Sequence, residues 1–247
     1  EGLSFTPVEI TGDDLLFLQY TGGTTGLSKG ATLTHRNLVA NIEQFSALAG
    51  DMIRDGEEVV ITALPLYHIF ALMVNCLSYF TKGGRNVLIT NPRDMPGFVA
   101  ELSNWKFSVI TGVNTLFNGL LHTPGFAECD FSNLRLTGGG GTAIQEAISN
   151  KWREVTGQHI TEGYGLSETS PVATFNVPGQ DEFTATIGVP LASTDIVLRG
   201  DEGEDVAQGE PGELCIKGPQ VMIGASPTRR RPSPPRMVIS APAMWLF

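Results

Sequence analysis

Short apolar runs alternate with longer amphipathic stretches through most of the chain. The runs that predict strands are 15–20, 31–34, 59–64, 86–90, 108–111, 134–137 and 159–162. The stretches that predict helices are 35–49, 69–80, 95–105 and 143–155. Thr34 stands directly before the first helical stretch, where a threonine side chain caps a helix well. The alternation predicts an α/β fold whose sheet is at least partly parallel.

The pattern changes from about residue 184 onward. Short strand-like runs at 195–198 and 213–217 are separated by turns rich in Gly, Asp and Glu. Such spacing is typical of antiparallel strands with one solvated face. We therefore expect a β-rich subdomain toward the C-terminus.

Composition narrows the class of protein. The 247 residues are 41% hydrophobic, with 16 Lys and Arg against 26 Asp and Glu, a net charge of −10. A chain of this size and composition buries a real core and is not intrinsically disordered. Its acidic balance argues against nucleic acid as a partner, because broad charge neutralisation needs an excess of Lys and Arg. Small nucleotides remain compatible with it.

Cysteines, apolar runs and the first residues bear on location. Cys76, Cys129 and Cys215 are far apart and predict neither a disulfide framework nor a zinc cluster. The longest apolar stretch, 69–80, is too short for a membrane-spanning helix. The chain begins without the basic and apolar regions of a secretory signal. These features predict a reducing, cytoplasmic location.

The last 23 residues differ in composition from the rest. All 29 glycines precede Ala225, and the segment 225–247 contains five prolines, four arginines and no acidic residue. The net charge is therefore 12 − 26 = −14 up to Gly224 and +4 beyond it. A disordered basic tail has this composition.

A glycine-rich loop is the sharpest chemical signal. Residues 20–30 read YTGGTTGLSKG. Glycines let a backbone close around an anion, the threonines add hydroxyl donors, and Lys29 adds a charge suited to a polyphosphate. The loop is not a Walker A motif, because Gly30 stands where that motif has Ser or Thr. A flexible turn is the alternative reading.

Two further segments lie after predicted strands. Gly138 to Gly141 would let a flat ring or a phosphate approach the main chain, although a plain loop has the same composition. Residues 162–169 bring together the Tyr164 ring, the Ser167 hydroxyl and the Glu168 carboxylate. Ligands of open α/β sheets bind beyond such strand ends. A carboxylate there suits Mg²⁺ beside nucleotide phosphates.

Four ordered segments resemble the core motifs of the adenylate-forming, or AMP-binding, superfamily. They are YTGGTTGLSKG at 20–30, LPLYH at 64–68, EGYGLSET at 162–169 and GELCIKGP at 212–219. The segments NPRD at 91–94 and GVNTLF at 112–117 are similar to bacterial long-chain fatty acid CoA ligases. The resemblance runs from about Leu3 to Gly224. It implies the central part of the large N-terminal domain of such enzymes, with mixed sheets flanked by helices.

The resemblance also implies roles for individual residues. Lys29, His68 and Glu168 would be catalytic, with His68 beside the acyl carboxylate, and Thr21 and Glu168 would hold Mg²⁺. The residues implied to bind ATP are Tyr20, Thr21, Gly22, Gly23, Thr24, Thr25, Gly26, Lys29, Gly139, Gly140, Gly141, Glu162, Gly163, Tyr164, Gly165 and Ser167. A core histidine is the alternative for His68. Apolar residues of 69–77 and 109–116 would line an acyl tunnel or, equally well, pack in a core.

The implied reaction is attack of a long-chain fatty acid on the α-phosphate of ATP, followed by thioester formation with coenzyme A. The alternatives are an aryl-CoA ligase, a peptide-synthetase adenylation domain and a non-catalytic nucleotide-binding remnant. The full-length protein is expected to be cytoplasmic with peripheral contact at the inner membrane face. No oligomeric state is predicted.

The resemblance predicts three parts of the chain. They are a partial AMP-binding core at 1–183, the start of the β-rich subdomain at 184–224 and the Pro/Arg-rich segment at 225–247. Because the resemblance stops at the residue where composition changes, we expect a fragment, inactive alone, whose last segment is either out of frame or a disordered tail.

Overall fold

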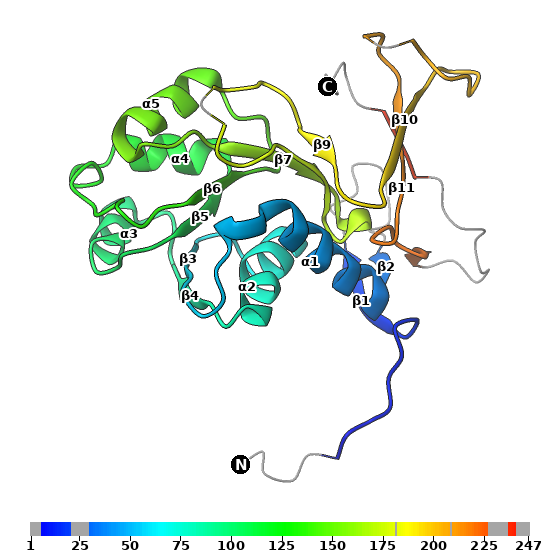
Figure 1. The fold of residues 1–247 in the computed structure, drawn as a ribbon, viewed down its shortest axis with the longest axis horizontal. Helices are drawn as coiled ribbons and strands as arrows, with labels where there is room; N and C mark the ends of the chain where they lie inside the picture. Colours follow the sequence, from blue (N-terminus) through cyan, green and yellow to red (C-terminus); the bar gives the residue numbers. More distant parts are fainter. Residues whose placement is uncertain (1–5, 21–29, 181, 208, 227–236, 241–247) are drawn as a thin grey trace.

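The fold was analysed in a computed structural model, which describes residues 6–20, 30–180, 182–207, 209–226 and 237–240 (Figure 1). Its centre is a seven-stranded sheet in the order β4-β3-β5-β6-β7-β8-β9. β4, β3, β5, β6 and β7 are parallel, whereas β8 and β9 join antiparallel. The bounds are β3 Val59–Thr62, β4 Arg85–Leu88, β5 Val109–Gly112, β6 Leu136–Gly139, β7 Thr161–Gly165, β8 Val172–Phe175 and β9 Val189–Pro190. The predicted mixed α/β class is confirmed.

Helices cover both faces of this sheet. α3 Met95–Leu102, α4 Asn114–Leu121 and α5 Glu146–Thr156 lie on one face, and Phe98, Phe117 and Trp152 pack there with Ile61 and Ile110. α1 His35–Ala49, a π-helix Ala71–Leu77 and α2 Ser78–Thr81 lie on the other face (Figure 1). Their core includes Phe45, Met73, Val60 and Val109. The molecule thus has three layers, with the strands buried between helices.

Two smaller antiparallel sheets complete the fold. One contains β1 Leu15–Tyr20, β2 Gly30–Thr34 and β12 Gly224–Ser226. The other contains β10 Asp195–Arg199, β11 Glu213–Lys217 and β13 Met237–Ser240. Leu214, Ile216 and Val221 form a third core with Ala173 of β8. The β-rich character expected after residue 184 is confirmed, while the three-part domain division stays a prediction.

The first helix shows how sequence determines a boundary. Thr34 has extended backbone and its hydroxyl accepts from the Asn37 N–H at 3.3 Å, while Asn37 Oδ1 accepts from the Thr34 N–H at 2.9 Å. Asn37 Nδ2 also donates to the carbonyls of Pro219 and Val221, at 2.8 and 3.0 Å. The predicted cap at Thr34 is confirmed. The Asn37 side chain additionally joins α1 to the segment around Pro219 and Val221.

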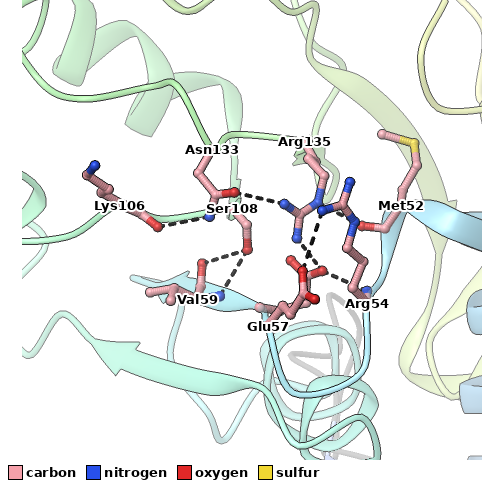
Figure 2. A network of polar contacts seen from close by, with 9 residues as sticks. Met52, Arg54, Glu57, Val59, Lys106, Ser108, Asn133 and Arg135 are labelled. Carbon is pink, nitrogen blue, oxygen red and sulfur yellow. Dashed lines mark hydrogen bonds and ion pairs between the residues drawn. The ribbon is translucent and has the colours of Figure 1, made fainter.

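A polar network lies at the amino ends of the parallel strands (Figure 2). Glu58, 1% exposed, directly precedes β3, and its Oε1 accepts from the Arg54 N–H at 2.7 Å and from Arg135 Nη2. Arg135, which precedes β6, also donates to Asn133 Oδ1 at 2.9 Å. Ser108, which precedes β5, accepts from the Val59 N–H at 2.9 Å. These contacts fix the strand starts relative to one another.

Several elements differ from the expectations. The stretch 69–80 is helical, but its middle is a π-helix rather than an α-helix. The glycine run does not begin after the strand, because Gly138 and Gly139 are the last residues of β6. α4, β8 and β9 were not predicted.

The described part of the chain contains no helix with the length and apolar character that a bilayer crossing requires.

Candidate functional site

A cavity of about 430 Å³ opens beyond the carboxyl ends of β6 and β7. This is the edge of a parallel sheet where ligands bind in open α/β folds, and it is opposite the network around Glu58. Its lining brings together three segments that the sequence singled out separately. The lining residues are Tyr20, His68, Ile69, Phe70, Val74, Gly139, Gly140, Gly141, Gly163, Tyr164, Gly165, Leu166, Ser167, Glu168, Pro171, Val172 and Phe175.

Gly139, the last residue of β6, and the following Gly140 and Gly141 form a wall without side chains. A Cβ on Gly139 would lie 2.7 Å from Ile160 Cγ2, and one on Gly140 would lie 3.3 Å from the Gly163 carbonyl oxygen and 3.4 Å from the Phe70 ring. Gly141 has φ +77°, which side chains rarely adopt. Larger residues here would displace the neighbouring β7 backbone or fill the cavity.

The glycines of β7 have a different reason to be small. A Cβ on Gly163 would overlap the Phe175 ring, and one on Gly165 would overlap the Pro171 carbonyl. Phe175 belongs to β8, which pairs antiparallel with β7, and Pro171 directly precedes β8. β7 and β8 therefore approach closely at the cavity, and the backbone of β7 forms part of its lining.

His68 lies at the cavity and is exposed, so the core-histidine alternative is wrong. Its ring Nδ1 accepts from the Phe70 backbone N–H at 3.2 Å, and the backbone N–H of His68 donates to the Pro65 carbonyl at 2.9 Å. The contact to Phe70 requires an unprotonated Nδ1 and orients the ring at the start of the helix.

Tyr164, Ser167 and Glu168 line the cavity together, as the spacing predicted. Ser167 and Glu168 belong to a short 3-10 turn, Ser167–Thr169, directly after β7. Burial, and secondly the Glu168 carboxylate, raise the pKa of the Tyr164 phenol above its usual value. The Glu168 carbonyl accepts from the Met222 N–H at 2.8 Å, which ties the turn to the C-terminal part of the chain.

Glu162 is the one described residue of the predicted ATP set that does not line this cavity. Its Oε1 accepts from the Ile144 N–H at 2.8 Å, in the loop that leads into α5. Burial raises the pKa of its carboxyl, and the bond from Ile144 lowers it to a lesser extent. Its side chain thus joins β7 to that loop.

The predicted phosphate loop lies outside the described residues. This applies to Thr21, Gly22, Gly23, Thr24, Thr25, Gly26 and Lys29. The two residues that flank it are described: Tyr20 and Gly30 are register partners at the ends of β1 and β2. Tyr20 also lines the cavity and is 60% exposed.

The apolar part of the lining was predicted in part. Ile69, Phe70 and Val74 belong to the stretch 69–77 proposed for an acyl tunnel. In the other proposed stretch, 109–116, Ile110 and Leu116 pack in the core on the side of α3–α5. Pro171, Val172 and Phe175 were missed, although the β-branched and aromatic run 172–175 is a signal for the strand that carries them.

Within the described residues, no three His, Cys, Asp or Glu side chains gather as a metal cluster. Glu168 is therefore a single carboxylate at the cavity. Mg²⁺ commonly takes only one or two protein oxygens and leaves its other positions to water and phosphate, so this arrangement is compatible with Mg²⁺.

The fold and cavity define an α/β protein with a ligand site at the carboxyl edge of its parallel strands. A family model described as AMP-binding enzyme matches residues 3–224. The chain therefore belongs to the AMP-binding enzyme family, as the four motifs suggested.

Individual relatives support the same family. The chain is 53% identical over 222 residues to a long-chain fatty acid CoA ligase of Yersinia pestis. The matched region covers 90% of the chain and 40% of the relative. A solved structure of the anthranilate CoA ligase AuaEII with anthranoyl-AMP has a TM-score of 0.83 at 22% identity, over 91% of the chain and 43% of AuaEII. ATP-bound MatB from Rhodopseudomonas palustris has a TM-score of 0.77 at 27% identity, over 90% of the chain and 43% of MatB.

Proposed function

We propose that the full-length protein activates a long-chain fatty acid with ATP and transfers the acyl group to coenzyme A. The chain spans about 40% of the length of the ligase that it resembles at 53% identity. The proposal therefore concerns the protein that carries this chain together with the remaining regions of such an enzyme.

The cavity carries the proposal. Part of its lining is backbone and polar groups, from Gly139 to Gly141 and from Ser167 and Glu168, and part is apolar, from Phe70 and Val74. A nucleotide needs the first kind of surface and an alkyl chain the second, and the reaction needs both to meet. His68 belongs to the same lining and is the candidate partner for the acyl carboxylate.

The roles follow from the chemistry of each group. The glycines of β6 and β7 accept a flat base against backbone, and the Tyr164 ring offers an aromatic face. Thr21 to Lys29 would donate to the ATP phosphates, with Thr21 and Glu168 as the metal ligands. Mg²⁺ bound there would neutralise charge on the phosphates. The fatty carboxylate attacks the α-phosphorus and pyrophosphate leaves. The coenzyme A thiol then attacks the acyl carbon, giving the thioester and AMP.

A cytoplasmic location with peripheral contact at the inner membrane face goes with this function. A fatty acid partitions into lipid, so a soluble ligase gains from meeting its substrate at a bilayer surface. This part of the proposal rests on substrate chemistry.

The test is acyl-CoA formation by the full-length protein from palmitate, ATP, Mg²⁺ and coenzyme A, with Lys29→Ala as the control for host ligase. We expect palmitoyl-CoA from the unchanged protein and a large loss in the variant. Pyrophosphate exchange with palmitate, benzoate and amino acids separates the alternatives. Exchange with benzoate or an amino acid alone would replace the fatty acid assignment, and ATP binding without any exchange would indicate a non-catalytic protein.

A further inference from the structure

Part of the cavity wall is formed by an unusual helix. Ala71–Leu77 is π-helical, and Val74 from it and Phe70 just before it line the cavity. π-helical turns are rare and frequently occur at functional sites. The contacts that stabilise this section therefore bear on the shape of the cavity.

Asn75 is the polar centre of the π-helix and is fully buried. Its Nδ2 donates to the Ile61 carbonyl at 3.3 Å and to Thr62 Oγ1 at 3.2 Å, both on β3. Its Oδ1 accepts from the Thr111 hydroxyl of β5 at 2.8 Å. One side chain thus joins the helix to two adjacent strands of the sheet.

Ser78 stabilises the wide turn from within the helix. Both its N–H and its hydroxyl donate to the Met73 carbonyl five residues earlier, the hydroxyl at 3.0 Å. Ser78 is fully buried, so these bonds do not compete with water. The π geometry is therefore built into buried polar contacts.

The same contacts connect two parts of the cavity lining. The Phe70 ring lies against Gly140, where an added Cβ would be 3.4 Å from Phe70 Cε1. Thr111 lies against Gly138 of β6, where an added Cβ would be 3.4 Å from Thr111 Cγ2. Thr111 therefore contacts β6 with its methyl group and Asn75 with its hydroxyl. The helix is thus anchored to β5, the strand that pairs with β6.

We infer that Asn75 is a positioning residue which, with Thr111, fixes the π-helix on the sheet, holds Phe70 against Gly140 and thereby determines which carboxylic acid fits the cavity. This inference rests on the proposed function, because the acid is the substrate proposed above. Apolar packing is non-directional and would let the helix move along the sheet, whereas hydrogen bonds to two strands fix its position. A cavity wall held firmly in place does not yield to a branch, so it favours an acid that is unbranched near its carboxyl group.

The test compares palmitate with 2-methylpalmitate in the full-length protein and its Asn75→Leu and Thr111→Val variants. Leu and Val leave buried polar partners unpaired, so the helix moves away from the sheet and Phe70 moves away from Gly140. A single methyl group in an apolar pocket changes discrimination about tenfold or more, so we expect the ratio of kcat/KM for palmitate to that for 2-methylpalmitate to fall about tenfold. Thr111→Ser keeps the hydroxyl and should keep the wild-type ratio.

Thr156→Val is the matched control. Thr156 is a buried threonine of α5 whose hydroxyl donates to the Trp152 carbonyl at 2.9 Å, and it does not line the cavity. It should lower the Tm without changing the substrate ratio. A ratio unchanged in Thr111→Val as well as in Thr156→Val would overturn the inference and leave Asn75 a purely structural residue.

An activity-independent readout separates this inference from the proposed function. The ring of Phe70 shifts the NMR signal of Gly140, and in a glycine-labelled protein Asn75→Leu or Thr111→Val should move that signal while Thr156→Val should not. An unmoved Gly140 signal contradicts the positioning role, whatever the enzyme acts on. A wild-type protein that forms acyl-CoA from neither acid contradicts the proposed function instead.

Discussion

Individual buried side chains at the amino edge of the parallel sheet stabilise the fold without contacting the cavity. The Glu58 side chain is fully buried and that of Arg135 is 17% exposed, so their charges are compensated mainly by each other. Figure 2 shows Arg135 also directed toward Asn133 and the Met52 carbonyl. A buried ion pair contributes little compared with a hydrophobic pair, but either charge alone is costly.

Arg135→Met is therefore expected to lower the free energy of unfolding by about 3 kcal/mol or more, because it leaves the Glu58 carboxylate buried without its partner. Adding Glu58→Leu should recover most of that loss. Urea denaturation of both variants measures the effect. Lys151→Met, which breaks the exposed pair with Glu154, is the control and should cost less than about 0.5 kcal/mol. Equal losses for the two single variants would contradict the account.

Glu168→Gln tests the metal ligand. The change keeps the size of the side chain and removes the charge that Mg²⁺ requires. In the full-length protein we expect a large loss of pyrophosphate exchange with little change in fatty acid binding. Full activity at ordinary Mg²⁺ concentrations would make Glu168 a structural residue of the turn after β7.

Glu162 provides a pH-dependent prediction. Its folded pKa is raised, chiefly by burial, so its contribution to stability is present below the ordinary carboxyl pKa and is lost as pH rises through the folded value. At neutral pH the ionised carboxylate thus carries a cost. Glu162→Gln, which still accepts from Ile144, should raise the free energy of unfolding at pH 7, with no difference below about pH 4. A variant less stable than wild type at pH 7 would contradict this.

At the scale of elements, α1 is stabilised by the cap at Thr34 and by bonds from Asn37 to the carbonyls of Pro219 and Val221. Thr34→Ala removes the side-chain cap and should cost about 1 kcal/mol. Asn37→Ala keeps the backbone N–H that Thr34 caps, but it removes the acceptor of the Thr34 N–H and leaves the Pro219 and Val221 carbonyls unpaired, so it should cost more, about 2 kcal/mol. Thermal unfolding of the two variants gives the comparison, with Thr34→Ser as the variant that keeps the cap. A smaller effect for Asn37→Ala than for Thr34→Ala would show that the bonds to Pro219 and Val221 are dispensable.

Helix caps and hydrophobic patterns predicted most elements, because these patterns are strong in helices and strands that bury one face. The cap at Thr34 and the buried strands β3 and β5 follow from residue type alone. The π-helix does not, because an apolar run has the same appearance whether the turn closes after four or five residues. The π-helical geometry depends on the buried hydrogen bonds of Asn75 with Thr111 and of Ser78 with Met73, which form only in the folded protein.

The candidate site was predictable as motifs but not as a shape. The motifs placed His68, Tyr164 and Glu168 on one cavity. Glu162 differs because its side chain accepts from the Ile144 N–H, a partner distant in sequence that the motif does not reveal. The part of the lining from Pro171 and Phe175 depends on the antiparallel pairing of β8 with β7, which a local sequence pattern does not determine.

For the whole molecule, burial predicts where the fold opens first. The amides of β5 and β6 are in strands whose residues are all buried, whereas β10 alternates exposed and half-buried residues. Hydrogen exchange measured by mass spectrometry should be slowest in 109–112 and 136–139 and faster in 195–199. Rates are compared after correction for intrinsic exchange. Protection of 195–199 equal to that of the central strands would show that the fold opens as one unit.

The bonds from Asn37 to Pro219 and Val221 also have a consequence for the order of events during synthesis. They span 182 and 184 residues, and β2 pairs with β12 across a similar separation. On the ribosome, the hairpin of β1 and β2 emerges well before β12, and the free edge of β2 stays unpaired until residue 224 has left the exit tunnel. Pairings this distant form late, because loop closure must precede the contacts that reward it. The hairpin is thus completed by a much later part of the chain, and a nascent chain halted before that point presents an open strand edge to chaperones.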